Sequence, residues 1–333
     1  MPSRTSHMCA FPAWKCATRK ALRRLGPWLR NSPRCCGACA RSITSSSTLR
    51  RELRLDAVIS DQRFGIRAEG LPSVIITHQL FPFTPFAQGV LRRINLRSVA
   101  RFDRCWVPDD ASAPGLAGDL SHGRNVPHNA RYIGPVSRMD PAKAIAPKAP
   151  YRIVCVISGP EPQRTLLEEA LMKQLPRIKG HHLLVRGKPE PALDETIVTP
   201  DGAPGIVHRV SHLGGDALTG ALLQAELIVS RTGYTTLMDL VRIGRSALVV
   251  PTPGQAEQEY LGQLHAKTGR FLMQAQERLD IADAIEGGRF AEPRVAQDWR
   301  SGIVPDTGTP SDAHHLLEHA LQDLAVIITM SRR

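Results

Sequence analysis

The sequence predicts an α/β protein made of two doubly wound, Rossmann-like domains that face each other across a cleft. Short apolar runs rich in β-branched residues recur along residues 55–273 and suit strands buried on both faces of a parallel sheet. Segments of helical character separate these runs, and such alternation is typical of a doubly wound sheet. The chain has 333 residues, enough for two domains of roughly 100–200 residues each.

Charge is concentrated at the N-terminus. Residues 1–51 hold 11 of the 43 Lys and Arg residues and no Asp or Glu, whereas the remainder holds 32 basic and 31 acidic residues. The net charge of +12 therefore describes the first 51 residues, and the nearly neutral remainder predicts no nucleic-acid groove. Apolar residues make up 42% of the chain, which allows a buried core. No apolar run approaches the ~20 residues of a membrane-spanning helix.

Residues 1–50 differ in character from the rest, with many Arg and Ser and no hydrophobic period. Three interpretations stay open: a transit peptide, a disordered tail, or a translated stretch that is not the natural start. Cys36 and Cys39 could form half of a zinc site, but no second pair at metal spacing follows, so no metal site is predicted. Cys105 and Cys155 lie in apolar runs and are expected to be buried thiols of a cytoplasmic protein.

Residues 51–140 are expected to form the N-terminal, acceptor-side domain. Its apolar runs end in polar clusters, and a helix that is both basic and apolar follows the second run. Strands are predicted at Asp56–Ser60, Ser73–Thr77, Arg104–Val107 and Arg131–Ile133, with the helix at Gln88–Ala100. Residues 141–150, rich in Pro and Lys, read as a linker.

Residues 151–310 are expected to form the second domain, and residues 311–333 a C-terminal helix at about Ser311–Leu324. A loop rich in Pro, Asp and Gly is predicted between the second and third strands of this domain. Its predicted strands are Tyr151–Ile157, His182–Arg186, Ile206–Val210, Leu227–Ser230, Ala247–Val250 and Phe271–Met273. Its predicted helices are Arg164–Leu175, Asp216–Gln224, Tyr234–Ile243 and Ala256–Ala266.

The strand end at residues 230–236 carries the chemistry of an anion site. In an open α/β sheet, free backbone N–H groups and the helix dipole meet where a strand leads into a helix. Gly233 permits close backbone approach, and Arg231 adds a permanent charge. Hydroxyl donors come from Thr232, Thr235 and Thr236. Asp239 lies one helical turn after the last two threonines and could accept from a ribose. Alternatively, Thr235 is only a helix cap.

Two further strand ends add polar groups. After the strand at Ala247–Val250, the residues Gln255, Glu257 and Gln258 could read sugar hydroxyls, although acids at a helix start also simply favour its dipole. After the strand at Tyr151–Ile157, a phosphate could be contacted by Ser158, Gly159 and Arg164. A proline-rich helix start without a ligand is the alternative there.

The motifs together resemble a known family. The pattern S-R-T-G-Y-T-T-x-x-D from Ser230, followed by V-P-T-P-G-Q-x-E-Q from Val250, is similar to the C-terminal domain of the MurG-like glycosyltransferases of family 28. The run P-S-V-I-I-T-H-Q near residue 75 and Y-I-G-P-V at 132–136 extend the resemblance into the N-terminal domain. With S-D-Q-R-F-G and G-P-E-P-Q-R-T, the chain resembles a bacterial branch of predicted glycosyltransferases over about residues 54–300.

The resemblance implies a GT-B fold and an inverting, metal-independent transfer of N-acetylhexosamine from a UDP-sugar to an acceptor that can be lipid-linked. It places Asp239 on the donor ribose, the Thr232–Thr236 turn near the diphosphate, and Gln255 and Gln258 near the donor sugar. The family usually has Glu where Asp239 stands. It implies no cofactor. Family members begin with a βα unit that residues 1–53 do not supply, so an incomplete N-terminal domain is expected.

Asp61 and His78 follow strands expected to face the cleft, and they are the candidate general bases. Either could instead have only a packing or capping role. The run LFPFTPF at 80–86, with Arg92, Arg93 and Arg97 after it, could touch a lipid acceptor or the inner membrane face, or its phenylalanines could pack inside.

Three other functions remain open at this point. A nucleotide-sugar hydrolase or epimerase would carry the same donor site. An inactive nucleotide-sugar-binding remnant would bind the donor without turnover. A nucleic-acid binder acting through the basic tail is the most distant alternative, because the rest of the chain is nearly neutral.

Overall fold

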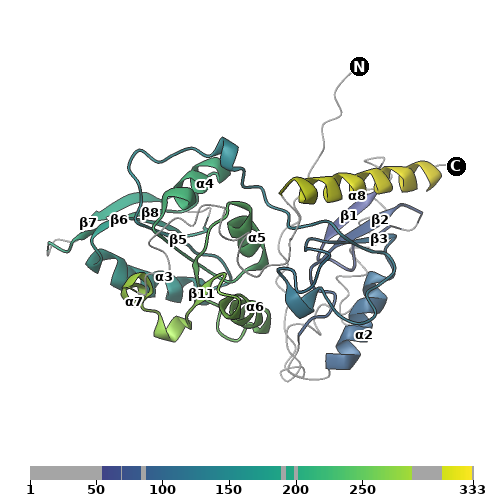
Figure 1. Ribbon diagram of the computed structural model, residues 1–333, viewed down its shortest axis with the longest axis horizontal. Helices are drawn as coiled ribbons and strands as arrows, with labels where there is room; N and C mark the ends of the chain where they lie inside the picture. Colours follow the sequence, from purple (N-terminus) through teal and green to yellow (C-terminus); the bar gives the residue numbers. More distant parts are fainter. Residues whose placement is uncertain are drawn as a thin grey trace, which may run out of the picture.

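The computed structural model describes residues 55–68, 70–83, 88–188, 193–198, 202–286 and 310–331. These residues form two α/β domains, each around its own sheet, with α8 of the chain's end lying over the N-terminal sheet (Figure 1). The basic tail, the Cys36 and Cys39 pair and the tip of the 80–86 run lie outside the described residues. No helix in the part that the structure describes is long and apolar enough to cross a bilayer.

The N-terminal sheet is parallel and its strands follow one another in sequence order, β1-β2-β3-β4. The strands are β1 (Val58–Asp61), β2 (Ser73–Ile76), β3 (Arg104–Val107) and β4 (Ala130–Tyr132). Helix α2 (Gln88–Val99) and helix α8 (Pro310–Ser331) lie on opposite faces of this sheet (Figure 1). The parallel sheet thus has the two covered faces that its continuous apolar runs predict.

The C-terminal sheet has the order β11-β10-β9-β5-β6-β8-β7 and is parallel except for β7 at one edge. Its strands are β5 (Ile153–Val156), β6 (Gly180–Val185), β7 (Asp194–Val198), β8 (Gly205–Val210), β9 (Leu227–Ser230), β10 (Leu248–Val249) and β11 (Leu272–Met273). Its helices are α3 (Gln163–Gln174), α4 (Gly215–Gln224), α5 (Tyr234–Arg242), α6 (Ala256–Lys267) and α7 (Ile281–Glu286). One apolar cluster joins α4, α5 and α6 to the sheet, and another joins α3 and α7 to its other face.

The predicted doubly wound α/β architecture is confirmed, and β3 and β9 have the bounds that the sequence predicts. The prediction of a loop between β6 and β8 was wrong in part, because this segment contains β7, which pairs antiparallel with β8. The residues of β7 alternate between half-buried and exposed, so this edge strand lacks the continuous apolar run used to find the others. Helix α7 was also missed, since its six residues are too few for a helical period.

Helix α8 connects the end of the chain to the N-terminal domain. Its Ala320 and Leu324 pack against Val74 and Trp106 of the sheet. The carboxylate of Asp323 accepts from the Nε of Arg104 at 2.5 Å and from its Nη2 at 3.0 Å. The helix also reaches seven residues beyond the predicted Leu324.

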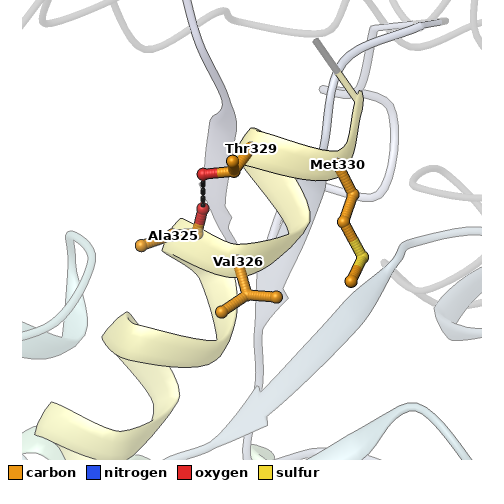
Figure 2. A pocket seen from close by; sticks show the side chains of 4 residues that line it. All are labelled: Ala325, Val326, Thr329 and Met330. Carbon is orange, nitrogen blue, oxygen red and sulfur yellow. Dashed lines mark hydrogen bonds between the residues drawn. The ribbon is translucent and has the colours of Figure 1, made fainter. Parts of the chain in front are cut away.

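The outer face of α8 has a shallow hollow of about 320 Å³ near the end of the helix. It is lined by Ala325, Val326, Thr329 and Met330 (Figure 2). The one hydroxyl there, on Thr329, donates to the carbonyl oxygen of Ala325 at 2.9 Å within the helix. The hollow therefore has apolar walls and carries no reactive group.

Candidate functional site at the strand ends of the C-terminal domain

The candidate site forms at the carboxyl ends of β5, β9 and β10, which are neighbours in the C-terminal sheet. Because these strands are parallel, the loops that follow them meet at one edge of the sheet, the usual ligand position in this architecture. The loops are residues 157–162, 231–233 and 250–255, and they lead into α3, α5 and α6. The three loops that the sequence selects are thus brought together.

Helix α5 offers an anion-binding N-terminus. It starts after Gly233, which has extended backbone angles and no side chain with which to cap the first-turn amides. Its first turn contains no acidic residue to neutralise the positive end of the helix dipole. The position that a Cβ would take on Gly233 is 3.7 Å from the Oγ1 of Thr236, so this hydroxyl lies beside the turn, while Thr235 is exposed. Amides and hydroxyl are arranged as a phosphate would need them.

Three buried hydroxyls at the ends of β9 and β10 lack partners among the described residues. Ser230, Thr232 and Thr252 are 1%, 0% and 2% exposed. Among the residues that the structure describes, no group donates to or accepts from these three hydroxyl oxygens. Buried polar groups are paired in the great majority of cases, and each exception calls for a reason such as an absent ligand. Gly159 in the neighbouring loop lies next to Thr252, since its Cβ position would be 3.8 Å from that hydroxyl.

Arg231 does not offer its charge to an open pocket. Its side chain is 1% exposed, and its Nη1 donates to the carbonyl oxygens of Val250 and Pro251 at 3.3 and 3.2 Å. Its Nη2 donates to the Gln163 carbonyl oxygen and to the Gln276 Oε1, both at 2.6 Å. Burial lowers the pKa of Arg231 to about 10. The guanidinium therefore ties the ends of β9 and β10 to the start of α3, a role that its position after a strand could not reveal.

The loop after β5 is braced by charged side chains. Arg164 donates to Glu161 Oε1 at 3.3 Å and to the Gly187 carbonyl oxygen at 2.9 Å. Lys188 Nζ lies 2.7 Å from the same Glu161 oxygen. Ser158 and Gly159, at the tip of the loop, are exposed. Arg164 thus shapes the loop, while the two small residues face the open edge of the sheet.

Asp239 contacts the segment that joins the domains. Its Oδ1 accepts a hydrogen bond from the Ser137 hydroxyl at 2.5 Å, and burial raises the pKa of its carboxyl group. The sequence did not single out Ser137. Asp239 lies one helical turn after Thr235 and Thr236 on α5. Its contact with Ser137 shows that the carboxylate faces the segment that joins the domains.

The loop before α6 is held by the side chains that were expected to read a sugar. Gln258 Oε1 accepts from the Thr252 backbone N at 2.9 Å, and Gln258 Nε2 donates to Gln255 Oε1 at 2.6 Å. Glu259 Oε1 accepts from the Gly254 backbone N at 2.9 Å. The two glutamines therefore lie together beside the buried Thr252 hydroxyl.

His78 contacts the C-terminal domain directly. Its ring stacks on that of Tyr234 with centroids 3.9 Å apart and an angle of 13° between the planes. Its Nε2 is 2.7 Å from the Oε1 of Glu257 on α6. Gln79 Nε2 donates to the other carboxylate oxygen at 2.5 Å. Asp61 is exposed at the end of β1. Of the two candidate bases, His78 is the one with described contacts to the C-terminal domain.

The domains also contact each other through a loop of the N-terminal domain. Tyr234 Oη donates to the Pro108 carbonyl oxygen at 2.8 Å. His265 Nε2 lies 2.9 Å from the Leu116 carbonyl oxygen, and burial lowers the pKa of His265 to about 4. The fully buried Asp109 holds this loop by accepting from the backbone N–H groups of residues 116 and 117. These contacts hold the loop of the N-terminal domain against α5 and α6 of the C-terminal domain.

The described part of the 80–86 run packs inside the protein. Leu80 and Phe81 are buried, and the Phe83 ring lies 4.4 Å from the Tyr260 ring of α6. The Arg92 guanidinium is 5.8 Å from the centroids of both phenylalanine rings. Arg93 and Arg97 on α2 are exposed. The described aromatic residues thus support the domain contact.

The sequence missed Ser230, Ser137, Tyr234 and Thr252 as site residues. The two hydroxyls at strand ends, Ser230 and Thr252, could have been found from their positions beside the predicted loops. The contacts of the others cross between segments far apart in the chain, and no local pattern signals them.

Comparisons with known proteins bear on the fold and on the C-terminal domain. Residues 215–289 match the glycosyltransferase family 28 C-terminal domain, a stretch that includes α5 and α6. The structure is similar to that of the glycosyltransferase SnogD from Streptomyces nogalater, with a TM-score of 0.55, 14% identity, and coverage of 91% of this chain and 82% of that one. This likeness shows the GT-B fold.

Two other solved structures are similar at lower scores. MurG from Acinetobacter baumannii has a TM-score of 0.47 and 13% identity, over 85% of this chain and 78% of that one. The spinosyn rhamnosyltransferase SpnG complexed with thymidine diphosphate has a TM-score of 0.47 and 17% identity, over 94% and 82%. No curated protein sequence matches the chain. The chain therefore carries a region that matches the glycosyltransferase family 28 C-terminal domain, within a protein that has the GT-B fold.

Proposed function

We propose that the chain transfers an N-acetylhexosamine from a UDP-sugar to an acceptor hydroxyl, with inversion at the anomeric carbon. The observation that carries the proposal is the set of buried, unpartnered hydroxyls of Ser230, Thr232 and Thr252 around the uncapped start of α5. A diphosphate would supply acceptor oxygens for all of these donors and a negative charge for the helix dipole. The family 28 match supports a nucleotide-sugar as the compound that brings the diphosphate.

The donor would extend from this diphosphate in two directions. Toward the segment that joins the domains, Asp239 would accept from the ribose hydroxyls; its position on α5, one helical turn after Thr235 and Thr236, supports this role. Toward α6, Gln255 and Gln258 present amide groups beside Thr252, where they could donate to and accept from sugar hydroxyls. Arg231 would keep the three loops in their relative positions, because its guanidinium bonds both the end of β10 and the start of α3.

The reaction we propose is a single displacement. The acceptor oxygen forms a bond to the anomeric carbon while the bond from that carbon to the diphosphate oxygen breaks, and the electron pair stays on the diphosphate. The α5 amides and the Thr232 hydroxyl would stabilise the charge that develops on this leaving group. The acceptor proton passes to a base of the N-terminal domain, and His78 is the candidate that faces the donor loops.

The proposal is tested by calorimetry with UDP and 2′-deoxy-UDP on the wild type and on Asp239→Ala. UDP should bind the wild type more tightly than the deoxy compound, because the carboxylate accepts from the 2′-hydroxyl. A hydrogen bond to a charged group is worth about 1.5–3 kcal/mol, so Asp239→Ala should weaken UDP binding roughly 10- to 100-fold and abolish the preference. Asp216→Ala, an exposed acid on α4, is the control and should change neither.

Two results would contradict the proposal. Absence of UDP binding by the wild type would remove the nucleotide-sugar donor itself. UDP release from UDP-N-acetylglucosamine that is as fast without added acceptor alcohols as with them would replace transfer by hydrolysis. An Asp239→Ala variant that still prefers UDP over 2′-deoxy-UDP would refute only the ribose contact.

A further inference from the structure

A network of hydrogen bonds crosses from β2 to α6 through the His78 ring, which is only 9% exposed. Its Nδ1 lies 3.3 Å from Gln62 Nε2, and its Nε2 lies 2.7 Å from Glu257 Oε1. The stacked Tyr234 ring holds the plane of the imidazole. Each ring nitrogen therefore has one defined partner, one from each domain.

The direction of every proton in this network follows from the chemistry of its members. The Thr77 hydroxyl accepts from the Gln79 backbone N at 3.0 Å and donates to Gln62 Oε1 at 2.9 Å. With its Oε1 accepting from Thr77, Gln62 turns its Nε2, which can only donate, toward the imidazole. Nδ1 of His78 must then accept, which leaves the hydrogen on Nε2.

The proton on Nε2 is donated to Glu257, a residue of the other domain. The second carboxylate oxygen of Glu257 accepts from Gln79 Nε2, so both oxygens are engaged by the N-terminal domain. Gln62, on the opposite side of the ring, holds a backbone φ of 55°, a region that non-glycine residues rarely adopt. Such backbone conformations cluster at functional sites, where the surroundings maintain them.

We propose that Glu257 is a positioning residue that holds His78 in the tautomer whose Nδ1 carries no hydrogen and can accept a proton. Gln62 Nε2 occupies the position from which an acceptor hydroxyl would donate to Nδ1. This inference rests on the proposed function, since it names the residue that prepares the base of that reaction. It adds that the base is complete only while Glu257 of α6 contacts His78 of the N-terminal domain.

The acceptor O–H bond breaks, its proton binds Nδ1, and its electron pair forms the new bond to the anomeric carbon. The bond between that carbon and the diphosphate breaks at the same time. His78 then carries a positive charge that the Glu257 carboxylate, 2.7 Å from Nε2, compensates. An orienting carboxylate of this kind stabilises an imidazolium without taking its proton.

Nitrogen-15 NMR of the histidine rings in the full chain tests the tautomer without any substrate. His78 is assigned by its loss in His78→Gln. In the wild type at neutral pH, His78 should show a protonated Nε2 and an unprotonated Nδ1. In Glu257→Ala it should show a mixture of tautomers, whereas Glu169→Ala, at an exposed acid of α3, should leave the signals unchanged. A single, unaltered tautomer in Glu257→Ala would overturn the inference.

Kinetics give a second readout, with UDP-N-acetylglucosamine as the donor and water as the acceptor. Glu257→Ala should lower the kcat of UDP release roughly 10²-fold, near the lower end of what a general base contributes, with the donor KM changed less than about twofold. His78→Ala combined with Glu257→Ala should be no slower than His78→Ala alone, because the two residues act as one unit. Additive losses, or a loss confined to KM, would overturn the inference.

UDP calorimetry separates this failure from that of the proposed function. The described hydrogen bonds of the Glu257 carboxylate go to His78 and Gln79 of the N-terminal domain, so Glu257→Ala should bind UDP like the wild type. If both bind UDP but the tautomer does not depend on Glu257, the dyad is refuted and the donor site stands. If neither binds UDP while the tautomer does depend on Glu257, the donor site is refuted and the positioning contact stands.

Discussion

Replacing Thr232 by Val should change stability and ligand affinity in opposite directions. Thr232 is 0% exposed at the end of β9, and its hydroxyl has no hydrogen-bond partner among the described residues. A buried polar group left unpaired costs about 1–3 kcal/mol. Val has nearly the shape of Thr without the hydroxyl, so Thr232→Val removes this cost. The ligand-free protein should therefore become more stable by up to that amount.

The same hydroxyl should contribute to binding once a diphosphate is present. A hydrogen bond to a charged oxygen is worth about 1.5–3 kcal/mol, and 1.4 kcal/mol corresponds to a tenfold change in affinity. Thr232→Val should thus weaken UDP binding roughly 10- to 100-fold. Gains in stability at the expense of binding are expected where a site keeps polar groups ready for its ligand.

Thermal unfolding and UDP calorimetry measure the two effects on the same preparation. Thr219→Val is the matched control, because Thr219 is equally buried but its hydroxyl donates to the Gly215 carbonyl oxygen at 2.8 Å. That variant should lose about 0.5–1.5 kcal/mol of stability, the net value of a satisfied hydrogen bond, and keep its UDP affinity. A Thr232→Val protein that is less stable than the wild type and binds UDP equally well would refute the reasoning.

Two further predictions concern the contacts that hold the domains. Burial lowers the pKa of His265 to about 4 from 6.5, so between these values the unfolded chain binds a proton that the native protein does not. The free energy of unfolding should be at its full value above pH 6.5 and fall by about 3 kcal/mol as the pH drops to 4. His265→Gln can still donate to the Leu116 carbonyl oxygen, and it should flatten this pH dependence in urea unfolding. An unchanged slope in this variant would exclude His265 as the source of the pH dependence. Leu324→Ala should cost about 2–5 kcal/mol by opening a cavity between α8 and the N-terminal sheet. Val326→Ala on the exposed face of α8 should stay within about 0.5 kcal/mol in the same unfolding assay, and equal losses in the two variants would show that α8 is not docked through its Leu324 face.

The order of elements was largely readable from the sequence because burial leaves a local signature. Strands such as β3 and β9 are covered on both faces, and their apolar runs end where the strands end. Edge strand β7 left no such signature, since only alternate residues are half-buried. Short helix α7 likewise offers too few residues for a period.

The donor loops were predictable for a similar reason. Loops that follow adjacent parallel strands must meet at one sheet edge, so polar residues at three such ends point to a common site. What each side chain does there was not predictable. Arg231 and a surface arginine look alike in sequence, but the fold surrounds Arg231 with backbone carbonyl oxygens that use its donors.

Residues 230–260 alone thus predicted a C-terminal domain similar to that of family 28, because strand, glycine turn and helix are neighbours in the chain and their chemistry is local. Only the tertiary structure decided that Glu257 reaches His78 and that Asp239 meets Ser137. These pairs are 179 and 102 residues apart. Their contacts exist because two separately folded sheets are packed against each other, and that packing depends on the shape of both surfaces rather than on any local pattern of residues.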